Sequence, residues 1–395
     1  MPSRSPARSS ADGPILVVAV SARALTEAVV RSGRPVIAVD LFGDADTRAA
    51  ATAHAVVPGS LDDGPDLAAV IAAGERLAAA HGEPAGVVVG SGFEHRPDAL
   101  AALGERWPLL GCPPDAVAAV KNPGRLATLC ADLSIPHPEI AATSPADPNG
   151  WVVKRAGGSG GAHVVPATVV AATGFADGHY WQRRVDGRSM SATILCDRVG
   201  ARLIGVCAAA FAPTPAAPYR FGGLAGPVAV ATTLAAEITA AADRLARTAG
   251  LRGLVGLDLV VDGARWWLIE VNPRPTVALD VLDRGMPPLM ALHIAACEAT
   301  SATGEGSATP AAPAWTPPAT TAATALVYAP ADGVTVAADW PDWVADRPLP
   351  GTAIPAGAPI CTVRAEGDDA GARTTLLELR ARSAMTLAFG EKTKH

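Results

Sequence analysis

Short apolar runs alternate with helical patterns over roughly the first hundred residues. The stretches 15–20, 35–40 and 86–90 predict buried strands, and the apolar spacing at 26–32 and 67–81 predicts helices. Strands that alternate with helices indicate a parallel α/β layer. The tetrapeptide Ser91-Gly92-Phe93-Glu94 follows the third strand, at the edge where ligands bind in such sheets, although an ordinary turn explains it as well.

The pattern changes after residue 116. A helix is predicted at 117–133, and strands are predicted at 151–155, 179–185, 191–196 and 203–211. An amphipathic helix at 234–248 and a further helix near 288–298 follow. Residues 300–323 are rich in Ala, Pro and Thr and predict an extended linker. Beyond it, short strands are predicted at 325–328, 333–337, 358–364 and 374–381. These strands predict a small β-rich C-terminal domain.

Two apolar strands in the second half of the chain each carry an acid. Asp258 lies in the middle of the run 255–261, and Glu270 lies near the end of the run that begins at Trp266. Asp262-Gly263 between the two runs predicts a tight turn. An acid inside a hydrophobic strand is costly unless a partner compensates its charge. The two acids therefore indicate either a salt-bridged hairpin or a site for a cation.

The register of this hairpin decides which side chains share a face. A three-residue loop, 262–264, would pair Asp258 with Leu268 and would put Asp258, Glu270 and Asn272 on one face. Leu257, Leu259, Trp267 and Ile269 would then lie together on the other face. A two-residue loop would move Asp258 to the opposite face, so the cleaner apolar face favours the longer loop.

The ligand types point to a magnesium nucleotide. Asp258, Glu270 and Asn272 form an all-oxygen set that suits Mg²⁺, as one or two ions, with Mn²⁺ as an alternative. Arg274, two residues after Asn272, would offer a forked cation to a phosphate or a carboxylate. The adjacent amide and guanidinium favour a ligand site over the salt-bridged hairpin.

Composition narrows the class of protein. The 395 residues suffice for two or three domains, and 49% are hydrophobic. A net charge of −6 without a basic block argues against a nucleic-acid partner. The apolar runs are too short to span a bilayer, so no membrane partner is expected. Six scattered cysteines without metal spacing indicate reduced thiols in a cytoplasmic protein.

A glycine-rich loop follows a strand that carries a lysine. Lys154 lies just before a loop made of Gly157, Gly158, Ser159, Gly160 and Gly161. Such a loop lets backbone N–H groups surround an anion, although a plain flexible turn is the alternative. It is not a Walker loop, because the lysine precedes the glycines. Lys121 is a second candidate cation, and segment 180–187 could present backbone groups to an adenine.

These pieces, in this order and over about residues 15–300, resemble the ATP-grasp superfamily of carboxylate-amine ligases. Lys121 and Lys154 correspond to its two nucleotide lysines, and the loop 157–161 to its mobile loop. Asp258, Glu270 and Asn272 correspond to its metal ligands, and Arg274 to its reactive-phosphate arginine. Gln182, Arg183 and Val185 correspond to the linker that reads adenine. Ser189 stands where many members place an acid on the ribose, which puts the sugar contacts in doubt.

The resemblance implies an α/β ATP-grasp fold with an N-terminal Rossmann-like domain and a small C-terminal β-rich domain. The expected divisions are a disordered start (1–13), the α/β domain (14–115), the ATP-grasp domain (116–300) with a lid at about 125–187, a linker (301–324) and the β-rich domain (325–395).

The implied activity is an ATP- and Mg²⁺-dependent ligase for a small-molecule carboxylate and an amine. Arg274 and Lys154 would be catalytic, and Arg220, Gly222 and Gly223 would line the acceptor pocket, for which a surface loop is the alternative. A homodimer is common in the superfamily. A kinase-like phosphotransferase using the same cleft and a noncatalytic ATP-binding module are the two alternative functions.

A narrower resemblance rests on Ser91-Gly92-Phe93-Glu94, Tyr219-Arg220-Phe221-Gly222-Gly223 and the C-terminal segment 350–363. These motifs look like a subgroup linked to tetrahydromethanopterin or methanofuran biosynthesis, whose relatives include tyramine–glutamate ligases. They imply glutamate as one substrate and a role in one-carbon cofactor biosynthesis.

Overall fold

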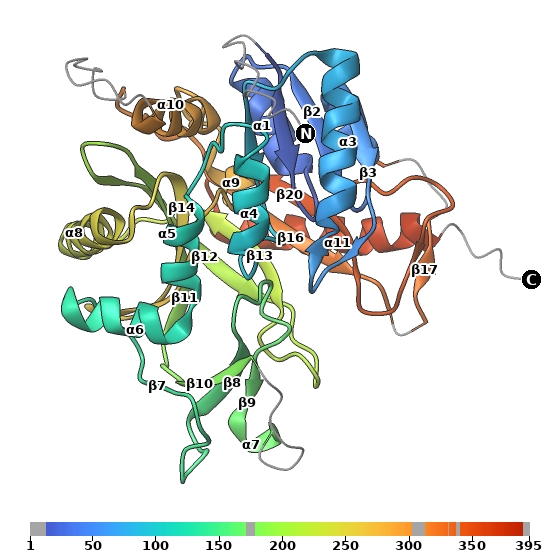
Figure 1. Ribbon diagram of the computed structural model, residues 1–395. Helices are drawn as coiled ribbons and strands as arrows, with labels where there is room; N and C mark the ends of the chain where they lie inside the picture. Colours follow the sequence, from blue (N-terminus) through green and yellow to red (C-terminus); the bar gives the residue numbers. More distant parts are fainter. Residues whose placement is uncertain (1–12, 171–177, 302–312, 331, 337–339, 390–395) are drawn as a thin grey trace, which may run out of the picture.

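The computed structural model describes residues 13–170, 178–301, 313–330, 332–336 and 340–389. Over these residues the chain forms an N-terminal α/β layer, a central eight-stranded antiparallel sheet and a small lobe with a four-stranded sheet (Figure 1). The mixed α/β architecture predicted from the sequence is confirmed. None of the helices in this described part is both long and apolar enough to cross a bilayer.

The N-terminal layer is built on a parallel sheet in the order β3-β2-β1-β6. Its strands are β1 (Ile15–Val18), β2 (Val36–Asp40), β3 (Ala53–Val56) and β6 (Gly86–Val89). Leu16 and Val18 join one hydrophobic core, whereas Ile15 and Val17 join another on the opposite face. Burial on both faces explains why these strands are continuous apolar runs in the sequence.

The helices of this layer are α1 (Arg23–Arg31), α2 (Ala45–Ala50), α3 (Leu67–His81) and α4 (Pro97–Gly104), with a short hairpin of β4 (Gly59–Ser60) and β5 (Gly64–Pro65). The predicted disordered start, 1–13, lies outside the described residues except for Gly13, whose carbonyl accepts a hydrogen bond from Arg34.

The predicted helix 117–133 is in fact two helices, α5 (Pro114–Lys121) and α6 (Pro123–Asp132). Asn122 precedes a proline and has an extended backbone, with ψ of 118°, so α5 ends there. The side chain of Asn122 then accepts the backbone N–H of Arg125 and caps α6. The break places Lys121 in the last turn of α5 rather than inside a long helix.

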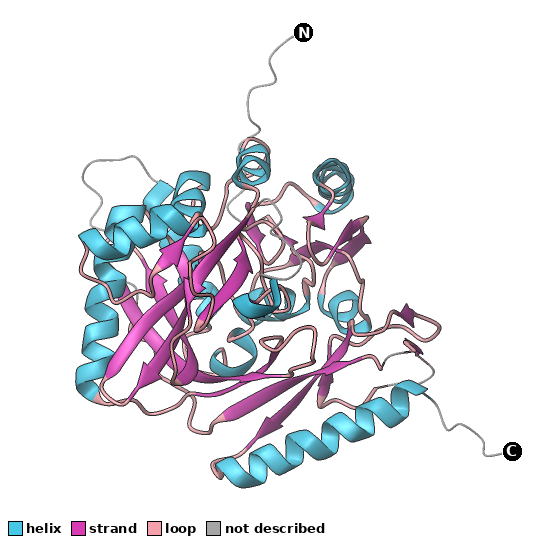
Figure 2. Cartoon of the chain, turned by 90° about the horizontal axis from the view of Figure 1, so that it is seen from below, coloured by secondary structure: helices cyan, strands magenta, loops and turns pink. Residues whose placement is uncertain are grey.

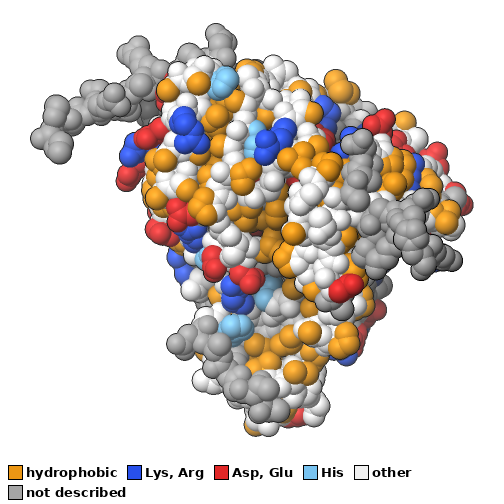
Figure 3. All heavy atoms as spheres, turned by 90° about the vertical axis from the view of Figure 1, so that its right-hand side faces the viewer, with side chains coloured by type: hydrophobic (Ala, Val, Ile, Leu, Met, Phe, Trp, Pro, Cys, Tyr) orange, Lys and Arg blue, Asp and Glu red, His pale blue; other side chains and the backbone are white. Residues whose placement is uncertain are grey.

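The lobe carries the glycine-rich loop. Its sheet has the order β7-β10-β8-β9, from β7 (Ile140–Ala141), β8 (Trp151–Arg155), β9 (Val165–Pro166) and β10 (His179–Arg183), followed by the short helix α7 (Ala167–Val170) after β9. Trp151, Val153, Ala167 and Trp181 form its own small core. In Figure 3 the lobe projects below the body, and charged and histidine side chains gather where the two meet.

The central sheet has the order β15-β14-β11-β12-β13-β16-β20-β18. Its first five strands in space are β15 (Arg265–Asn272), β14 (Gly253–Asp262), β11 (Arg188–Cys196), β12 (Ala201–Phe211) and β13 (Phe221–Gly226). The amphipathic helix α8 (Thr232–Ala249) covers one face through Leu234, Ile238 and Leu245, as its spacing predicted. The short helix α9 (Leu279–Leu282) and α10 (Leu289–Ser301) follow the hairpin.

The predicted three-residue loop of the β14–β15 hairpin is wrong. Asp262 pairs with Arg265, so the loop has two residues and begins at Gly263, which has a φ of +61°. A bulge at Ile269 then shifts the register, and Asp258 pairs with Glu270 instead of Leu268. The bulge therefore restores the shared face of the two acids that the shorter loop would have removed.

The bulge also corrects the predicted apolar face of the hairpin. Leu257 and Leu259 are buried in the core as expected, but their partners on β15 are Trp266, Leu268 and Val271. Trp267 and Ile269, which were predicted to join them, are only half-buried.

The C-terminal segment extends the central sheet instead of forming a sheet of its own. β16 (Ala322–Tyr328) pairs with β13, β20 (Pro359–Glu366) pairs with β16, and β18 (Val344–Ala345) pairs with β20. A separate two-stranded ribbon is formed by β17 (Val334–Thr335) and β19 (Ala353–Ile354). Residues 302–312 of the predicted linker lie outside the described residues. Thr316, in its described part, exchanges backbone hydrogen bonds with Met286.

The predicted strand 374–381 is wrong, because these residues belong to the helix α11 (Ala370–Phe389). Leu377, Ala381, Ala384 and Ala388 recur every three to four residues and pack on the core that includes Val363. Thr374 and Thr375 favoured a strand locally, but this apolar spacing decides the element. Figure 2 shows the long C-terminal helix beside the sheet, where it contacts β16 and β20.

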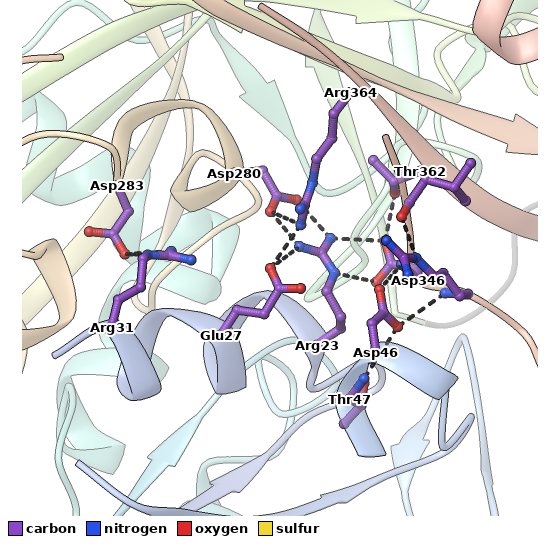
Figure 4. Close-up of polar contacts among 12 residues, drawn as sticks. Arg23, Glu27, Arg31, Asp46, Thr47, Asp280, Asp283, Asp346, Thr362 and Arg364 are labelled. Atoms are coloured by element: carbon purple, nitrogen blue, oxygen red, sulfur yellow. Dashed lines mark hydrogen bonds and ion pairs between the residues drawn. The ribbon is translucent and has the colours of Figure 1, made fainter. Parts of the chain in front are cut away.

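A buried polar network joins the N-terminal, middle and C-terminal parts of the chain (Figure 4). Arg23 is 2% exposed and donates to Asp280 at 2.7 Å and to Asp346 at 2.9 Å. Arg364 donates to Asp280 at 3.0 Å and to Glu27 at 2.9 Å. Burial disfavours the charged form of Asp280, but Arg23 outweighs this and lowers its pKa to about 2. The acids therefore depend on Arg23 for their charge balance.

We expect Arg23→Met to lower the free energy of unfolding by about 3–5 kcal/mol, because it leaves two acids inside the protein without their main partner. Urea unfolding at pH 7 measures this loss. The matched control is Arg106→Met, because Arg106 pairs with Glu75 on the surface and both side chains are 51% exposed. That variant should lose less than about 1 kcal/mol. Equal losses in the two variants would show that the buried network adds nothing.

His293 is a second buried titratable group. It is 0% exposed, and its Nδ1 accepts the backbone N–H of Leu254 at 2.8 Å. Its Nε2 lies 3.0 Å from the carbonyl of Leu110, to which it must donate. Burial lowers the pKa of His293 to about 4. Protonation of Nδ1 would also turn the hydrogen bond from Leu254 into a contact between two donors.

Acid should therefore destabilise the protein through His293. The unfolded chain binds this proton near pH 6.5 and the folded chain only near pH 4, so the contribution is complete above pH 6.5 and is lost as the pH falls. The loss at pH 4 is about 3 kcal/mol. Unfolding of His293→Gln should depend less on pH in this window. The exposed control His81→Gln should keep the wild-type profile, and a wild-type profile for His293→Gln would contradict the assignment.

Candidate active site

The hairpin β14–β15 places the three predicted metal ligands on one face. Asp258 and Glu270 are direct partners across the strands, and Asn272 lies two residues beyond Glu270 on the same face. The amide nitrogen of Asn272 donates to Asp258 Oδ2 at 2.9 Å, so its amide oxygen remains an acceptor. The hydroxyl of Ser191, opposite Asp258 on β11, bonds to the same carboxylate.

The two carboxylates differ in their electrostatic surroundings. Burial, followed by the charge of Glu270, raises the pKa of Asp258. Burial acts in the same direction on Glu270, but the ammonium groups of Lys121 and Lys154 outweigh it and lower its pKa to about 2. Glu270 is therefore held as an anion, whereas Asp258 is the carboxylate that a further cation would stabilise.

Lys121 and Lys154 converge on Glu270 from different elements. Lys121, in the last turn of α5, is 8% exposed and pairs with Oε1 of Glu270. Lys154, on β8 of the lobe, is 4% exposed, and its Nζ lies 3.6 Å from Oε2. Glu270 is thus salt-bridged, as the alternative interpretation of the hairpin predicted. The two lysines that neutralise it are the ones expected to bind phosphates.

A hollow of about 360 Å³, part of it open to solvent, lies beside these lysines. Val120, Leu126, Ile140 and Ile269 form apolar walls, and Lys121, Lys154, Gln182 and Glu270 form its polar end. Gln182 is 3% exposed, and its side chain donates to the carbonyl of Ile269 and accepts from Lys154, both at 3.4 Å. Apolar walls that end at two ammonium groups suit a nucleotide.

A magnesium ion fits the donor set of the hairpin. Within the described residues, no group of three or more His, Cys, Asp and Glu side chains is arranged to bind a metal. An ion here would therefore be held by Asp258, Glu270 and the amide oxygen of Asn272, with phosphate or water oxygens completing its shell. The raised pKa of Asp258 shows that the pair carries a repulsion that a dication would relieve.

The glycine-rich loop packs against the body of the molecule. The backbone N–H of Phe221 donates to the carbonyl of Gly160 at 2.8 Å. A Cβ atom at Gly157 would come within 2.4 Å of His95, and one at Gly161 within 2.1 Å of the carbonyl of Tyr219. Both glycines have a φ of +71°, so close approach and backbone conformation both require glycine there. Gly158 packs against His163, and Ser159 is exposed.

Of the glycine-rich loop only Gly157 lines the hollow. Seven residues predicted to bind the nucleotide lie outside its lining: Gly158, Ser159, Gly160, Gly161, Arg183, Val185 and Ser189. Arg183 is exposed on β10, and its guanidinium lies 5.6 Å from the ring centre of Trp151. Its backbone N–H donates to the carbonyl of Glu139 at 2.8 Å, so this group already has a partner. Val185 lies in the connection between β10 and β11, and Ser189 lies within β11. Of the predicted adenine linker, only Gln182 lines the hollow, through its side chain.

The predicted acceptor pocket around Arg220 has structural contacts of its own. The guanidinium of Arg220 stacks on the ring of Tyr328 at 3.7 Å. Gly222 and Gly223 lie inside β13 rather than in a surface loop. A Cβ atom at Gly223 would come within 2.0 Å of the carbonyl of Thr324 on β16. Close strand packing accounts for this glycine, and an acceptor pocket at this place stays a prediction.

Arg274 contacts an acid to which sequence reasoning gave no role. Its Nε lies 2.6 Å and its Nη2 lies 2.5 Å from Oε1 of Glu94, which is 4% exposed. The other oxygen of Glu94 accepts the backbone N–H groups of Gly92 and Phe93. Burial opposes the charge of Glu94, but Arg274 and then Lys121 outweigh it and lower its pKa. The position after β6 suggested a ligand edge, but no local pattern links it to Arg274.

Comparison with known proteins agrees with this geometry. Residues 125–278 match a family model described as an ATP-grasp domain. The chain has an ATP-grasp fold. The match includes Lys154, Glu270 and Arg274, whereas Lys121 and Glu94 precede it. A search of curated proteins finds no match to the chain.

Solved structures show the same fold over nearly the whole chain. Biotin carboxylase from Campylobacter jejuni, described as a complex with β,γ-ATP, aligns over 93% of this chain and 90% of its own, with a TM-score of 0.68 and 15% identity. The biotin carboxylase domain dimer of Hydrogenobacter thermophilus 2-oxoglutarate carboxylase, described in complex with MgADP, ADP and bicarbonate, aligns over 94% of this chain and 89% of its own. Its TM-score is 0.67 and its sequence identity is 12%. An L-amino acid ligase from Bacillus licheniformis aligns over 94% of this chain and 97% of its own, with a TM-score of 0.65 and 13% identity. Such identities establish the ATP-grasp fold alone.

The ion pair between Glu94 and Arg274 should be strongly coupled. In a double-mutant cycle of Glu94→Gln and Arg274→Gln, we expect a coupling energy of about 1–3 kcal/mol in the free energy of unfolding, because both side chains are largely buried. The matched control is the pair Asp262 and Arg265, whose side chains are 50% and 72% exposed. Its cycle should give less than about 0.5 kcal/mol. A Glu94–Arg274 coupling as small as that of the control pair would refute the contact.

Proposed function

We propose that this chain is an ATP-dependent ligase that activates a carboxylate as an acyl phosphate and couples it to an amine, releasing ADP and phosphate. The observation that carries the proposal is the convergence of Lys121 and Lys154 on Glu270 beside the hollow that these residues line, which is called the first hollow below. Asp258 and Asn272 on the same hairpin supply the other oxygen ligands. The ATP-grasp fold supports this proposal, and one of the structural neighbours is an amino acid ligase.

In this proposal the first hollow binds ATP. The apolar walls hold the adenine with the side chain of Gln182 at its edge, and Lys121 and Lys154 exchange Glu270 for the α- and β-phosphates. A Mg²⁺ ion held by Asp258, Glu270 and Asn272 would offset the negative charge of the phosphates. The loss of its lysine partners would leave Glu270 free to share that ion with Asp258.

Arg274 and the glycine-rich loop act on the transferred group. Arg274 stabilises the γ-phosphoryl group as it passes to the substrate carboxylate, because its guanidinium follows the metal ligands directly along the chain. The loop 157–161 already packs against the body, and there it would exclude water from the acyl phosphate, which otherwise hydrolyses. The amine then attacks the acyl carbon and displaces phosphate.

Finer assignments belong to the same proposal. The subgroup linked to tetrahydromethanopterin or methanofuran biosynthesis, with glutamate as a substrate, stays a prediction that rests on the motifs at 91–94, 219–223 and 350–363. The number of ions, the use of Mn²⁺, a homodimer and a cytoplasmic location also stay predictions. So do the domain boundaries.

The deciding experiment is an ATP-dependent coupling screen of amino acids with aryl amines, read by product mass and ADP release. Glu270→Gln should lower ADP formation by about 100-fold or more, because it removes a metal ligand and a negative charge from the phosphate site. The exposed control Glu75→Gln should keep full activity. An active Glu270→Gln enzyme would refute the metal assignment. A phosphorylated product formed without amine would instead favour a kinase-like transferase, and MgATP binding without turnover a noncatalytic module.

A further inference from the structure

A second hollow lies between the N-terminal layer and the residues that follow β15. It has about 370 Å³ of empty space, part of it open to solvent. Val89, Phe93, Leu100, Leu109 and Val117 form its apolar walls. It therefore lies at the carboxyl edge of the parallel sheet, where ligands bind in α/β layers. Its apolar lining, with charge at one place, is typical of a pocket for a small molecule.

The two hollows are lined by neighbouring parts of the same two segments of the chain. The helix α5 contributes Val117 to the second hollow and Lys121 to the first. The end of β15 and the residues after it contribute Glu270 to the first hollow and Arg274 to the second. A molecule in the second hollow would therefore meet the ATP site at Arg274.

The charge of the second hollow is confined to one place. Among the described residues that line it, Glu94 and Arg274 are the charged ones, and they pair with each other. A guanidinium has five N–H donors. Within the described residues, Nε and Nη2 of Arg274 donate to Glu94, and Nη1 donates to the carbonyl of Pro275 at 3.1 Å. Two donors thus remain for the oxygens of a ligand, so the polar end of that ligand should be an anion.

We propose that the second hollow binds the acid substrate, a monocarboxylic acid whose carboxylate meets Arg274 and whose body is apolar. This inference rests on the proposed ligase function, and it names the substrate class for that site. The walls offer an apolar body about 25 cal/mol for each Å² removed from water. Among the described residues, and beyond the paired Glu94 and Arg274, they offer no charged group for the ammonium or the other carboxylate of free glutamate. Glutamate would then enter as the amine.

Gly111 is a lining residue of this pocket with open space beside it. It lines the second hollow, and a Cβ atom added to it meets nothing within 4 Å. Gly90 lines the same hollow, but a Cβ atom there would come within 2.7 Å of Ala19 and so points into the protein. A side chain at position 111 would therefore displace no protein atoms, so a change in ligand binding there would report on the space beside the lining.

The test measures binding and turnover separately. Calorimetry on the full chain saturated with Mg²⁺ and ADP follows the binding of straight-chain acids from acetate to hexanoate. We expect the affinity of the wild type to rise about fourfold with each added methylene until the pocket is full. In Gly111→Val the rise should end at least one methylene earlier, and in Gly111→Ala the effect should be smaller. Gly104→Ala, at the end of α4 and outside the lining, is the matched control and should follow the wild type.

The outcomes separate this inference from the proposed function. Affinity that does not change with chain length, a wild-type series in both Gly111 variants, or tighter binding of the matching amines would each overturn it. MgADP binding and thermal unfolding test whether each variant is folded. If Gly111→Val is not folded, Gly111→Ala provides the comparison with the wild type. If the series holds but no acid yields ADP with ATP and amines, the ligase function fails and the pocket stands. If only polar acids turn over and the series is flat, the pocket fails and the ligase stands.

Discussion

Glu270 is a buried carboxylate whose charge two lysines from different parts of the molecule compensate. Without partners such a group would cost several kcal/mol inside the protein. Lys121 comes from the body, on α5, whereas Lys154 comes from the lobe, on β8. The same contact therefore neutralises the acid and holds the lobe against the body. A polyphosphate that draws both ammonium groups away would remove the compensation of the charge of Glu270 and the contact that holds the lobe, so both would change together.

The meeting of Asp258 with Glu270 depends on a single extra residue. The turn that the chain forms, beginning at Gly263, would place the acids on opposite faces of the sheet, and the bulge at Ile269 brings them back together. The shared face could be predicted from the spacing of apolar and polar residues, because burial of one face restricts the register. The loop length and the bulge could not be predicted. A three-residue loop without a bulge and a two-residue loop with one both put the acids on the same face, and no local pattern distinguishes the two arrangements. Ser191 was missed for the same reason, because its place opposite Asp258 follows from the register of a third strand.

Predictions from the sequence succeed where one local pattern decides the element. The strands of the N-terminal layer are apolar throughout because both faces are buried, and α8 shows its covered face in its spacing. They fail where tertiary contacts or competing local signals decide, as at the Asn122-Pro123 break and in α11. The pairing of Glu94 with Arg274 spans 180 residues and that of Arg23 with Asp280 spans 257, so neither leaves a local signal. The shared face of residues 258, 270 and 272 could be predicted, and Lys121 and Lys154 were expected near a nucleotide, but their contact with Glu270 could not be predicted.

The arrangement of the two hollows divides recognition between different parts of the chain. The segment that matches the ATP-grasp model supplies Lys154, Glu270 and Arg274, which in the proposed function act on the phosphates common to every ATP. Glu94 and Gly111 lie outside that segment, in or after the N-terminal layer, and line the hollow proposed for the acid. This division has a physical reason, because phosphate geometry is the same in every reaction while the acid differs in shape and polarity. In the proposed function Arg274 serves both the acid and the phosphoryl group, and its ion pair with Glu94 would link the N-terminal layer to the site of transfer.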